Sequence, residues 1–386
     1  MINEPQQLEL ADIFNAHGDA FLRQNKLCTQ QAKAFRAIQN CRSIESGKHA
    51  SQCDKCGYVK YAYNSCHNRH CPKCQFTKQA RWIDRLKANL PPTKYFHMIF
   101  TIPPALHKTF YINQEICYSM LFKAAAQTIK QCAANPIYLG AQYGAVAVLH
   151  TWGQTLTYHP HIHMMVPTGG LSEDNMEWIP ARNNFFAPVK SMQKIFRGIL
   201  CRIMEHSVEK GDISLPEDIN FFSDLKSKLY QKHWNVRVEK PLKGPSRVIE
   251  YLGQYTQRVA ISNHRLIRDH DGKISFSYKD YKTGGTSRNM TLEAHEFIRR
   301  FLQHVLPLGF YKIRYFGILA QSNSKTKTAC CFDLIDNEVF LSSLEGLPAI
   351  EVYRIITGKD PARCPNCKNG KMLPLSCKDR ISEAPG

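Results

Sequence analysis

The stretch HPHIHMMV at residues 159–166 restricts the local fold more than any other part of the sequence. Three histidines alternate with other residues, and alternate side chains of an extended strand point to the same face. We therefore predict a β-strand over residues 158–166, with His159, His161 and His163 on one face and apolar side chains packed into a core on the other. Neighbouring imidazoles on a rigid strand suit a metal ion. The alternative is a polar strand face with chance histidines.

The charge of the chain favours an anionic partner. Its 386 residues hold 51 Lys and Arg against 32 Asp and Glu, which gives a formal net charge of +19. A field of that sign attracts polyanions, most often nucleic acid, although a merely basic soluble surface is the alternative. The sequence has no apolar run of membrane-spanning length, and its first residues are acidic and amphipathic. We therefore expect a cytoplasmic protein of two or three domains that binds no membrane.

Cysteine spacing predicts a structural zinc ion. The sequence has 15 cysteines and no export signal, so we interpret them as thiols and metal ligands. Cys53-x-x-Cys56 and Cys71-x-x-Cys74 are two pairs separated by fourteen residues. Each pair makes a tight turn that aims both sulfurs at one point, so the two pairs together complete a tetrahedral zinc site.

Other potential ligands leave the number of zinc sites open. Donors near the two pairs either form a second site, replace one thiolate, or contact phosphate and solvent beside Arg69. A further pair near the C-terminus is either half of a second zinc site or two free thiols. The nearby donors are His49, Cys66, His67 and His70, and the C-terminal pair is Cys364 and Cys367.

Hydrophobic periodicity predicts an α+β class with an antiparallel sheet, because the pattern shows no βαβ rhythm and no phosphate-binding glycine loop. Asp271-Gly272 indicates a hairpin within residues 271–290. Residues 240–245 are expected to form a basic turn, and the chain past residue 310 indicates no particular element. The predicted helices are 5–23, 29–40, 75–90, 111–134, 188–209, 217–230 and 291–304, and the predicted strands are 95–102, 143–151 and 158–166.

Two tyrosines share one face of a further predicted helix. The pattern is helical from residue 246 to about residue 260, and Tyr251 and Tyr255 are four residues apart within it. Gly253 lies between them; glycine inside a helix costs about 1 kcal/mol relative to alanine, and close approach of another backbone is one reason that would justify it. The alternative is that both tyrosines are ordinary core residues. The arginines around the pair are Arg247, Arg258, Arg265 and Arg268.

A histidine-held metal, paired tyrosines and a positive field together fit phosphodiester transfer on a DNA strand. The metal binds phosphate oxygens and stabilises the developing charge. A tyrosine attacks phosphorus and becomes covalently linked to the DNA, so the bond energy is kept and rejoining needs no ATP.

The chain resembles the rolling-circle insertion-sequence transposases of the IS91 family, which are two-tyrosine HUH endonucleases. The matching motifs are CDKCG at 53–57, YNSCHNRHCPKCQ at 63–75, FHMIFTIPP at 96–104, LHTWGQTLTYHPHIHMMVPTGG at 149–170 and VIEYLGQYTQRVAISNHRL at 248–266. The resemblance implies that His161 and His163 bind catalytic Mg²⁺ or Mn²⁺ and that Tyr251 and Tyr255 are the nucleophiles. It also implies a 5′-phosphotyrosine, a free 3′-OH, and a substrate of single-stranded DNA at the element ends.

The resemblance also sets the expected organisation and partners. It implies an HUH-type antiparallel sheet flanked by helices, preceded by an N-terminal helical and zinc-ribbon-like module. We expect that module at residues 1–91, the catalytic domain at 92–305 and a C-terminal region with a cysteine pair at 306–386. Expected partners are element-end DNA, target DNA and host helicase or replication proteins, in the nucleoid of a bacterial cell. The expected DNA-binding residues are Arg69, Arg247, Arg258 and Arg265.

The sequence leaves open the third metal ligand and several alternative classes of protein. The third ligand of the catalytic metal is His150, Gln254 or Gln257. A plasmid relaxase or replication initiator has the same chemistry. A histidine-triad nucleotide hydrolase also has alternating histidines, but that class explains neither the cysteines nor the tyrosines. A zinc-finger protein that binds DNA without cutting it is the remaining alternative.

Overall fold

The computed structural model describes residues 7–74, 76–182, 186–242, 244, 260–335 and 339–375. The backbone forms two compact units. The first comprises Met1–Asp84, Gln257–Val305 and Ser343–Gly386, and the second comprises Arg85–Thr256 and Leu306–Ser342. The expected three-part division at residues 91 and 305 stays a prediction.

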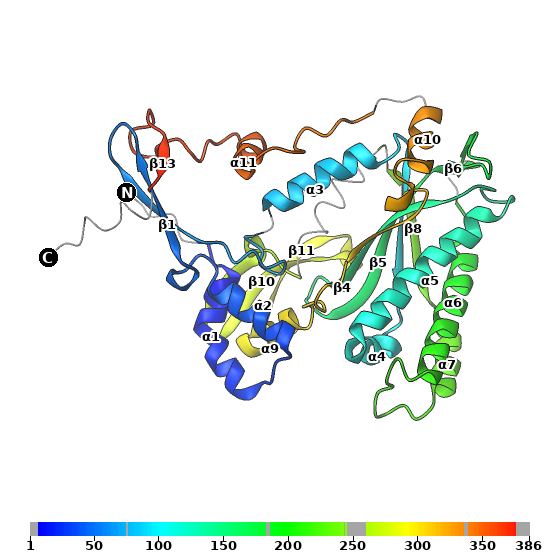
Figure 1. Ribbon diagram of the computed structural model, residues 1–386. Helices are drawn as coiled ribbons and strands as arrows, with labels where there is room; N and C mark the ends of the chain where they lie inside the picture. Colours follow the sequence, from blue (N-terminus) through cyan, green and yellow to red (C-terminus); the bar gives the residue numbers. More distant parts are fainter. Residues whose placement is uncertain are drawn as a thin grey trace. The chain divides into compact units, whose positions relative to one another are not determined.

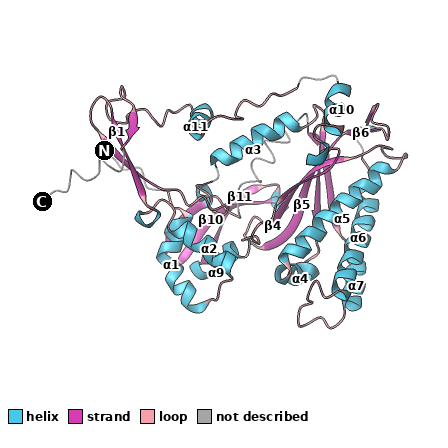
Figure 2. Cartoon of the chain, in the orientation of Figure 1, coloured by secondary structure: helices cyan, strands magenta, loops and turns pink. Residues whose placement is uncertain are grey.

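The second unit is built on a five-stranded sheet in which every pair of neighbouring strands is antiparallel. The order across the sheet is β12-β4-β5-β3-β8. Figure 2 shows β4 and β5 of this sheet in magenta and the helices in cyan. The strands are β3 (Tyr95–Thr101), β4 (Gly144–Trp152), β5 (Tyr158–Pro167), β8 (Asn235–Leu242) and β12 (Ile313–Gly317). The mixture of helices with an antiparallel sheet confirms the predicted α+β class.

Helices cover one face of this sheet. Helices α5 (Gln114–Ala134) and α6 (Val189–Glu209) lie beside the sheet (Figure 1). Side chains of β3 and β5, among them Ile162, Met164 and Val166, are buried in one core with residues of these helices. The apolar face predicted for the histidine strand is therefore confirmed. The helices of this unit are α4 (His107–Ile112), α5 (Gln114–Ala134), α6 (Val189–Glu209), α7 (Phe222–Gln231) and α10 (Lys327–Leu334), and a small hairpin joins β6 (Gly169–Leu171) to β7 (Trp178–Pro180).

Two parts of the main sheet differ from the sequence prediction. Residues 240–242 continue β8 instead of forming a turn, and a register irregularity opposite Tyr95–His97 accompanies Pro241. Because β8 is an edge strand, a residue without a backbone N–H is tolerated there. β12 was not predicted, since its five residues IRYFG are too few to show a clear period.

The first unit joins helices that lie far apart in the sequence. In α1 and α2, Phe14 stacks on Phe35 with ring centroids 4.7 Å apart, and Phe301 of α9 meets Phe14 edge-on at 5.6 Å. The predicted Asp271-Gly272 turn is confirmed, because both residues have positive φ and join two paired strands. The elements are α1 (Leu10–Gln24), α2 (Thr29–Gln39), α9 (Ala294–Leu302), α11 (Ala349–Thr357), β9 (Leu266–His270), β10 (Lys273–Asp280) and β11 (Thr286–Glu293).

A second sheet of the first unit is also assembled from distant segments. Its order is β13-β1-β2, so a strand near residue 373 pairs with a hairpin near residue 50. Its strands are β1 (Lys48–Cys53), β2 (Val59–Tyr63) and β13 (Met372–Pro374), and α3 (Phe76–Asn89) follows the hairpin in the sequence. None of the helices in the described part of the chain is long and apolar enough to span a membrane.

We predict that Phe196→Ala destabilises the second unit by about 3–5 kcal/mol. Phe196 is fully buried, and its ring lies 5.1 Å from Phe100 and 5.4 Å from Trp234 between centroids. Its removal leaves a cavity between α6 and the sheet. Urea unfolding followed by tryptophan fluorescence measures the change, with the exposed Lys194→Ala on the same helix as control. Equal unfolding midpoints for the two variants would contradict this packing.

Candidate functional site

Three histidines converge on the face of the main sheet opposite the helical core. His161 and His163 lie on β5, and His150 of β4 is directly opposite His161 in the strand register. One ring nitrogen from each of these three histidines lies within 4.8 Å of the others. The Nε2 atoms of His161 and His163 are 3.0 Å apart. We call this set the histidine cluster.

Hydrogen bonds orient the two rings of β5. The Nδ1 atom of His161 lies 2.6 Å from the carbonyl oxygen of His159, so Nδ1 carries the proton and donates it. Its Nε2 atom therefore keeps a lone pair that faces His163.

His163 is oriented by a pair of residues on neighbouring strands. His97 Nδ1 donates to Glu239 Oε2 at 2.6 Å, and His97 Nε2 lies 2.8 Å from His163 Nδ1. With His97 neutral, its Nε2 atom accepts the Nδ1 proton of His163, which leaves the Nε2 lone pair of His163 facing that of His161. A carboxylate–histidine–histidine chain of this kind fixes both the tautomer and the orientation of a metal ligand.

The protonation state of the cluster suits a metal. Burial lowers the pKa of His161 to about 3 and holds the pKa of His163 well below the ordinary value of an imidazole. Both rings are therefore neutral at physiological pH, which is the form that binds metal. The hydrogen bond from His97 in turn lowers the pKa of Glu239, so this side chain is a carboxylate.

The geometry of the cluster also fits a divalent ion. Two nitrogens bound at about 2.1 Å in adjacent positions of an octahedron are roughly 3.0 Å apart. The observed Nε2–Nε2 separation is 3.0 Å. His150 was one of three sequence candidates for the third ligand, and it lies in the cluster. The other two candidates, Gln254 and Gln257, lie outside the described residues.

The remaining residues proposed from the sequence are placed differently. Tyr251, Tyr255, Arg247 and Arg258 lie outside the described residues, so their roles stay predictions. His159 is outside the histidine cluster; its ring centroid lies 5.1 Å from that of His161 and 6.1 Å from that of His107.

The two described arginines of the predicted DNA-binding set are partly buried in the first unit. Arg69 is half-buried, and burial lowers its pKa. Arg265 donates from Nε to the carbonyl oxygen of Ser277 at 2.7 Å, and its guanidinium lies 5.8 Å from the ring centroid of Phe276. A contact of either arginine with DNA stays a prediction.

The structure corrects the predicted grouping of cysteines. The pairs Cys53-x-x-Cys56 and Cys71-x-x-Cys74 do not share one site, because each converges with a different second pair. Cys71 and Cys74 converge with Cys41 and Cys66, and we call these four residues the N-terminal cysteine cluster. Cys53 and Cys56 converge with Cys364 and Cys367, and we call these four residues the composite cysteine cluster.

The N-terminal cysteine cluster has the dimensions of a zinc site. Its sulfur–sulfur distances include 3.3 Å for Cys41–Cys74, 3.6 Å for Cys66–Cys74 and 3.6 Å for Cys41–Cys71. Tetrahedral zinc with bonds of about 2.3 Å places sulfurs about 3.8 Å apart, whereas a disulfide brings them to about 2.0 Å. The four thiols therefore fit zinc. His49 and His70 instead have hydrogen bonds to Asn64 and Asn68, respectively.

Sequence reasoning missed three residues of these sites. Cys41 directly follows the C-cap of α2 and belongs to no CxxC pair, so only its proximity to the cysteine-rich segment pointed to it. His97 is a single histidine within an apolar strand, and Glu239 lies in a segment interpreted as approaching a turn. Their pairing depends on the order of strands in the sheet, which local sequence does not reveal.

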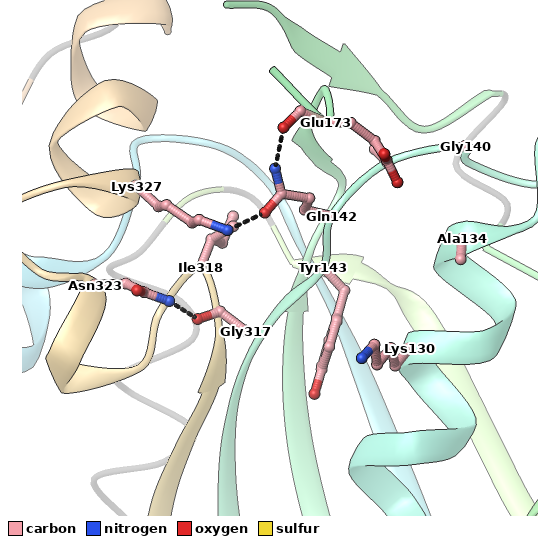
Figure 3. Close-up of a pocket in the computed structure, with 11 residues that line it drawn as sticks. Lys130, Ala134, Gly140, Gln142, Tyr143, Glu173, Gly317, Ile318, Asn323 and Lys327 are labelled. Carbon is pink, nitrogen blue, oxygen red and sulfur yellow. Dashed lines mark hydrogen bonds between the residues drawn. The ribbon is translucent and has the colours of Figure 1, made fainter. Parts of the chain in front are cut away.

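A pocket of about 410 Å³ lies elsewhere in the second unit (Figure 3). Lys327 Nζ donates to Gln142 Oε1 at 2.5 Å, and Asn323 donates to the carbonyl oxygen of Gly317 at 2.8 Å. Gln142 precedes β4, and His150 is six residues along that strand from Gly144, or roughly 20 Å at 3.3 Å per residue. None of the histidines of the cluster lines this pocket.

Comparisons with known proteins define the class. A family model described as a putative transposase matches residues 144–327, and a model described as a transposase zinc-binding domain, named for IS91, matches residues 13–102. These ranges contain the histidine cluster and the N-terminal cysteine cluster, respectively. By these sequence matches the chain is a transposase with a zinc-binding domain.

Two curated relatives identify the family. The chain is 40% identical over 386 aligned positions to a putative transposase, y4qJ, of Sinorhizobium fredii, with 98% of this chain and 97% of the relative covered. It is 29% identical over 301 positions to the transposase for insertion sequence element IS801 of Pseudomonas savastanoi pv. phaseolicola, covering 76% of this chain and 69% of the relative. The chain belongs to the IS91 family of transposases. No solved structure matches it.

We predict that Cys41→Ser weakens zinc binding at the N-terminal cysteine cluster on the order of a hundredfold. Structural zinc binding of about 10–16 kcal/mol is shared among four ligands, and each 1.4 kcal/mol is a factor of ten. Competition with a chromophoric chelator measures the affinity. The matched control is Cys28→Ser, because Cys28 is exposed and belongs to neither cluster. Equal affinities in the two variants would exclude Cys41 as a ligand.

Proposed function

We propose that this transposase nicks and rejoins single-stranded DNA at insertion-sequence ends through a metal-assisted 5′-phosphotyrosine intermediate, as in rolling-circle transposition. The observation that carries the proposal is the histidine cluster, in which the Nε2 atoms of His161 and His163 face each other at 3.0 Å. Two such lone pairs repel unless a cation lies between them, and oxygen-rich phosphate is a natural further ligand of Mg²⁺ or Mn²⁺.

The proposal assigns metal binding to the histidines and nucleophilic attack to a tyrosine. His161 and His163, with His150 as third ligand, hold the ion, and His97 and Glu239 keep the ring of His163 in the metal-binding tautomer. Bound Mg²⁺ or Mn²⁺ supplies Lewis-acid activation of the scissile phosphate and stabilises its developing charge. Tyr251 or Tyr255 loses its phenolic proton to solvent, and its Oη forms a bond to phosphorus. The bond between phosphorus and the 3′ oxygen breaks, and that oxygen takes a proton to become a 3′-OH.

Two nucleophiles allow a second cut before the first is resealed. One tyrosine holds the first DNA end as a phosphodiester while the other attacks a second strand. In the reverse reaction a 3′-OH attacks the phosphotyrosine, which restores the DNA backbone and the free tyrosine. The net charge of +19 supports binding of the phosphate backbone. The sequence has no P-loop, so strand separation would fall to host helicase or replication proteins.

The zinc-binding domain is assigned to DNA positioning. A site closed by four thiolates has no open position for a reacting group, so its role is structural. In this proposal it presents basic residues such as Arg69 to the DNA, while the histidine cluster carries out the cleavage.

We predict that His97→Ala lowers the Mn²⁺ affinity of the histidine cluster by roughly 10–100-fold. Loss of His97 frees the ring of His163 to rotate and to change tautomer. Isothermal titration calorimetry with Mn²⁺ measures the affinity of protein that is treated with chelator and then reloaded with zinc at the cysteine clusters alone, with the exposed His206→Ala as control. Glu239→Gln keeps an acceptor oxygen for His97 and is expected to have a smaller effect. Unchanged affinity in His97→Ala would remove His97 from the site.

We predict that a Tyr251→Phe/Tyr255→Phe variant loses covalent DNA attachment and at least roughly a thousandfold in cleavage rate. The substrate is a 3′-labelled single-stranded oligonucleotide with the element end, incubated with Mg²⁺ or Mn²⁺. Denaturing gels report both the adduct and the cut strand. Tyr311→Phe is the matched control, because Tyr311 is 79% exposed and lies outside the proposed helix.

The alternatives give different outcomes in the same experiment. Cleavage at full rate by the double phenylalanine variant would indicate a histidine nucleophile and would refute tyrosine transfer. Absence of any adduct or cut strand with either ion in the unmodified protein would support a protein that binds DNA without cutting it.

A further inference from the structure

We propose that the composite cysteine cluster is a second structural zinc site, which joins the C-terminal segment of the chain to the hairpin of the zinc-binding domain. Its four ligands would be Cys53, Cys56, Cys364 and Cys367. Two of them lie outside residues 13–102, the range matched by the zinc-binding domain. The inference does not depend on the cleavage chemistry, because none of these residues belongs to the histidine cluster.

The sulfur positions fit tetrahedral zinc. Cys53 Sγ lies 3.7 Å from Cys367 Sγ, and Cys56 Sγ lies 3.7 Å from Cys364 Sγ. Tetrahedral coordination with zinc–sulfur bonds of about 2.3 Å places sulfurs about 3.8 Å apart. A disulfide would require about 2.0 Å, and all four residues are free cysteines. Four convergent thiolates in a tetrahedral arrangement select zinc over magnesium or calcium.

The two CxxC turns of the composite cysteine cluster have the same backbone conformation. Gly57 and Lys368 each directly follow the second cysteine of a pair, and each has positive φ, at 69° and 63°. The Gly57 N–H donates to the carbonyl oxygen of Cys53 at 3.2 Å, and the Lys368 N–H donates to that of Cys364 at 3.2 Å. Each pair is therefore a tight turn that directs its two sulfurs to one point, and the two turns match.

Further donors point at the sulfurs. The backbone N–H of Cys56 donates to Cys53 Sγ at 3.5 Å, and that of Gly370 donates to Cys367 Sγ at 3.3 Å. The side-chain amide of Asn366 lies 3.8 Å from Cys56 Sγ. Such donors stabilise negatively charged sulfur, so they support thiolates bound to a cation rather than neutral thiols.

The surrounding contacts bring the two halves together in one register. In the β1–β13 pair, Cys53 is opposite Met372, and the Asp54 carboxylate accepts the backbone N–H of Lys371 at 2.8 Å. A Cβ atom on Gly370 would lie 2.2 Å from Cys53 Sγ, so glycine is needed for this close approach. The arrangement is therefore specific to these two segments, which are more than 300 residues apart in the sequence.

The zinc ion would stabilise the docking of the C-terminal segment on the β1–β2 hairpin, which the protein contacts alone stabilise only weakly. An isolated hairpin such as β1–β2 is marginally stable, and β13 adds only three residues to it. Closing a loop of this length is entropically costly, and metal binding offsets that cost directly through folding. The C-terminal pair would therefore stay docked on β1 only while the ion is bound.

Zinc content of the full-length protein tests the proposal. The His161→Ala/His163→Ala background removes the histidine cluster. In this background we expect two zinc ions per chain, as measured by inductively coupled plasma mass spectrometry. Cys364→Ser/Cys367→Ser in that background should bind one ion, and the control Cys28→Ser/Cys330→Ser should bind two. Two ions in the Cys364→Ser/Cys367→Ser variant, or one in the control, would overturn the composite site.

Thiol alkylation of the unmutated protein gives an independent test that does not require a substituted chain to fold. Cys56 is exposed and Cys367 is half-buried, as is Cys330, which is in neither cluster. We expect iodoacetamide to modify Cys56 and Cys367 at least tenfold more slowly with zinc than after chelation, while the rates at Cys28 and Cys330 stay unchanged. Equal rates at Cys56 and Cys367 with and without chelator would refute the site. DNA cleavage is assayed separately, so failure here leaves the proposed function untouched.

Discussion

The alternation of side chains along β5 is the constraint on which the histidine cluster depends. The core-facing residues Ile162, Met164 and Val166 are buried against helices, so a slip of one residue would turn them away from the core and bury the histidines there instead. β4 and β3 pair with β5 on either side and hold it in register. The rings of His161 and His163 therefore project from the middle of a sheet, where the packing of β5 leaves them little conformational freedom.

The parts of the fold that follow local periodicity could be predicted from the sequence. The strands predicted at 95–102, 143–151 and 158–166 and most helices are examples, because a period of two or 3.6 is visible within ten residues. The two cysteine clusters could not be grouped from spacing alone, because each CxxC turn forms locally while its partner is chosen by tertiary contacts. Cys41 and Cys364 show this: one follows a helix and the other lies near the end of the chain. The interaction of His97 with His163 likewise depends on which strands are neighbours.

The two kinds of candidate metal site have donors of different chemistry and suit different tasks. Neutral imidazoles on a sheet face leave coordination positions for phosphate and solvent, which suits a reacting centre. Four thiolates in matched turns surround an ion completely, which suits a structural role. In the IS91 family member described here, we infer that the first kind cuts DNA while the second kind shapes the surface that holds it.

Mass spectrometry of the covalent DNA–peptide adduct tests the central claim most directly. The protein is trapped on a single-stranded element end with Mn²⁺, digested with protease and nuclease, and sequenced by fragmentation. We expect the modified peptide to carry a 5′-phosphate-linked nucleotide on Tyr251 or Tyr255, and the adduct to be absent after His161→Ala/His163→Ala. A nucleotide attached to a histidine, or to a tyrosine outside residues 246–260, would contradict the assignment of the tyrosine pair to the histidine cluster.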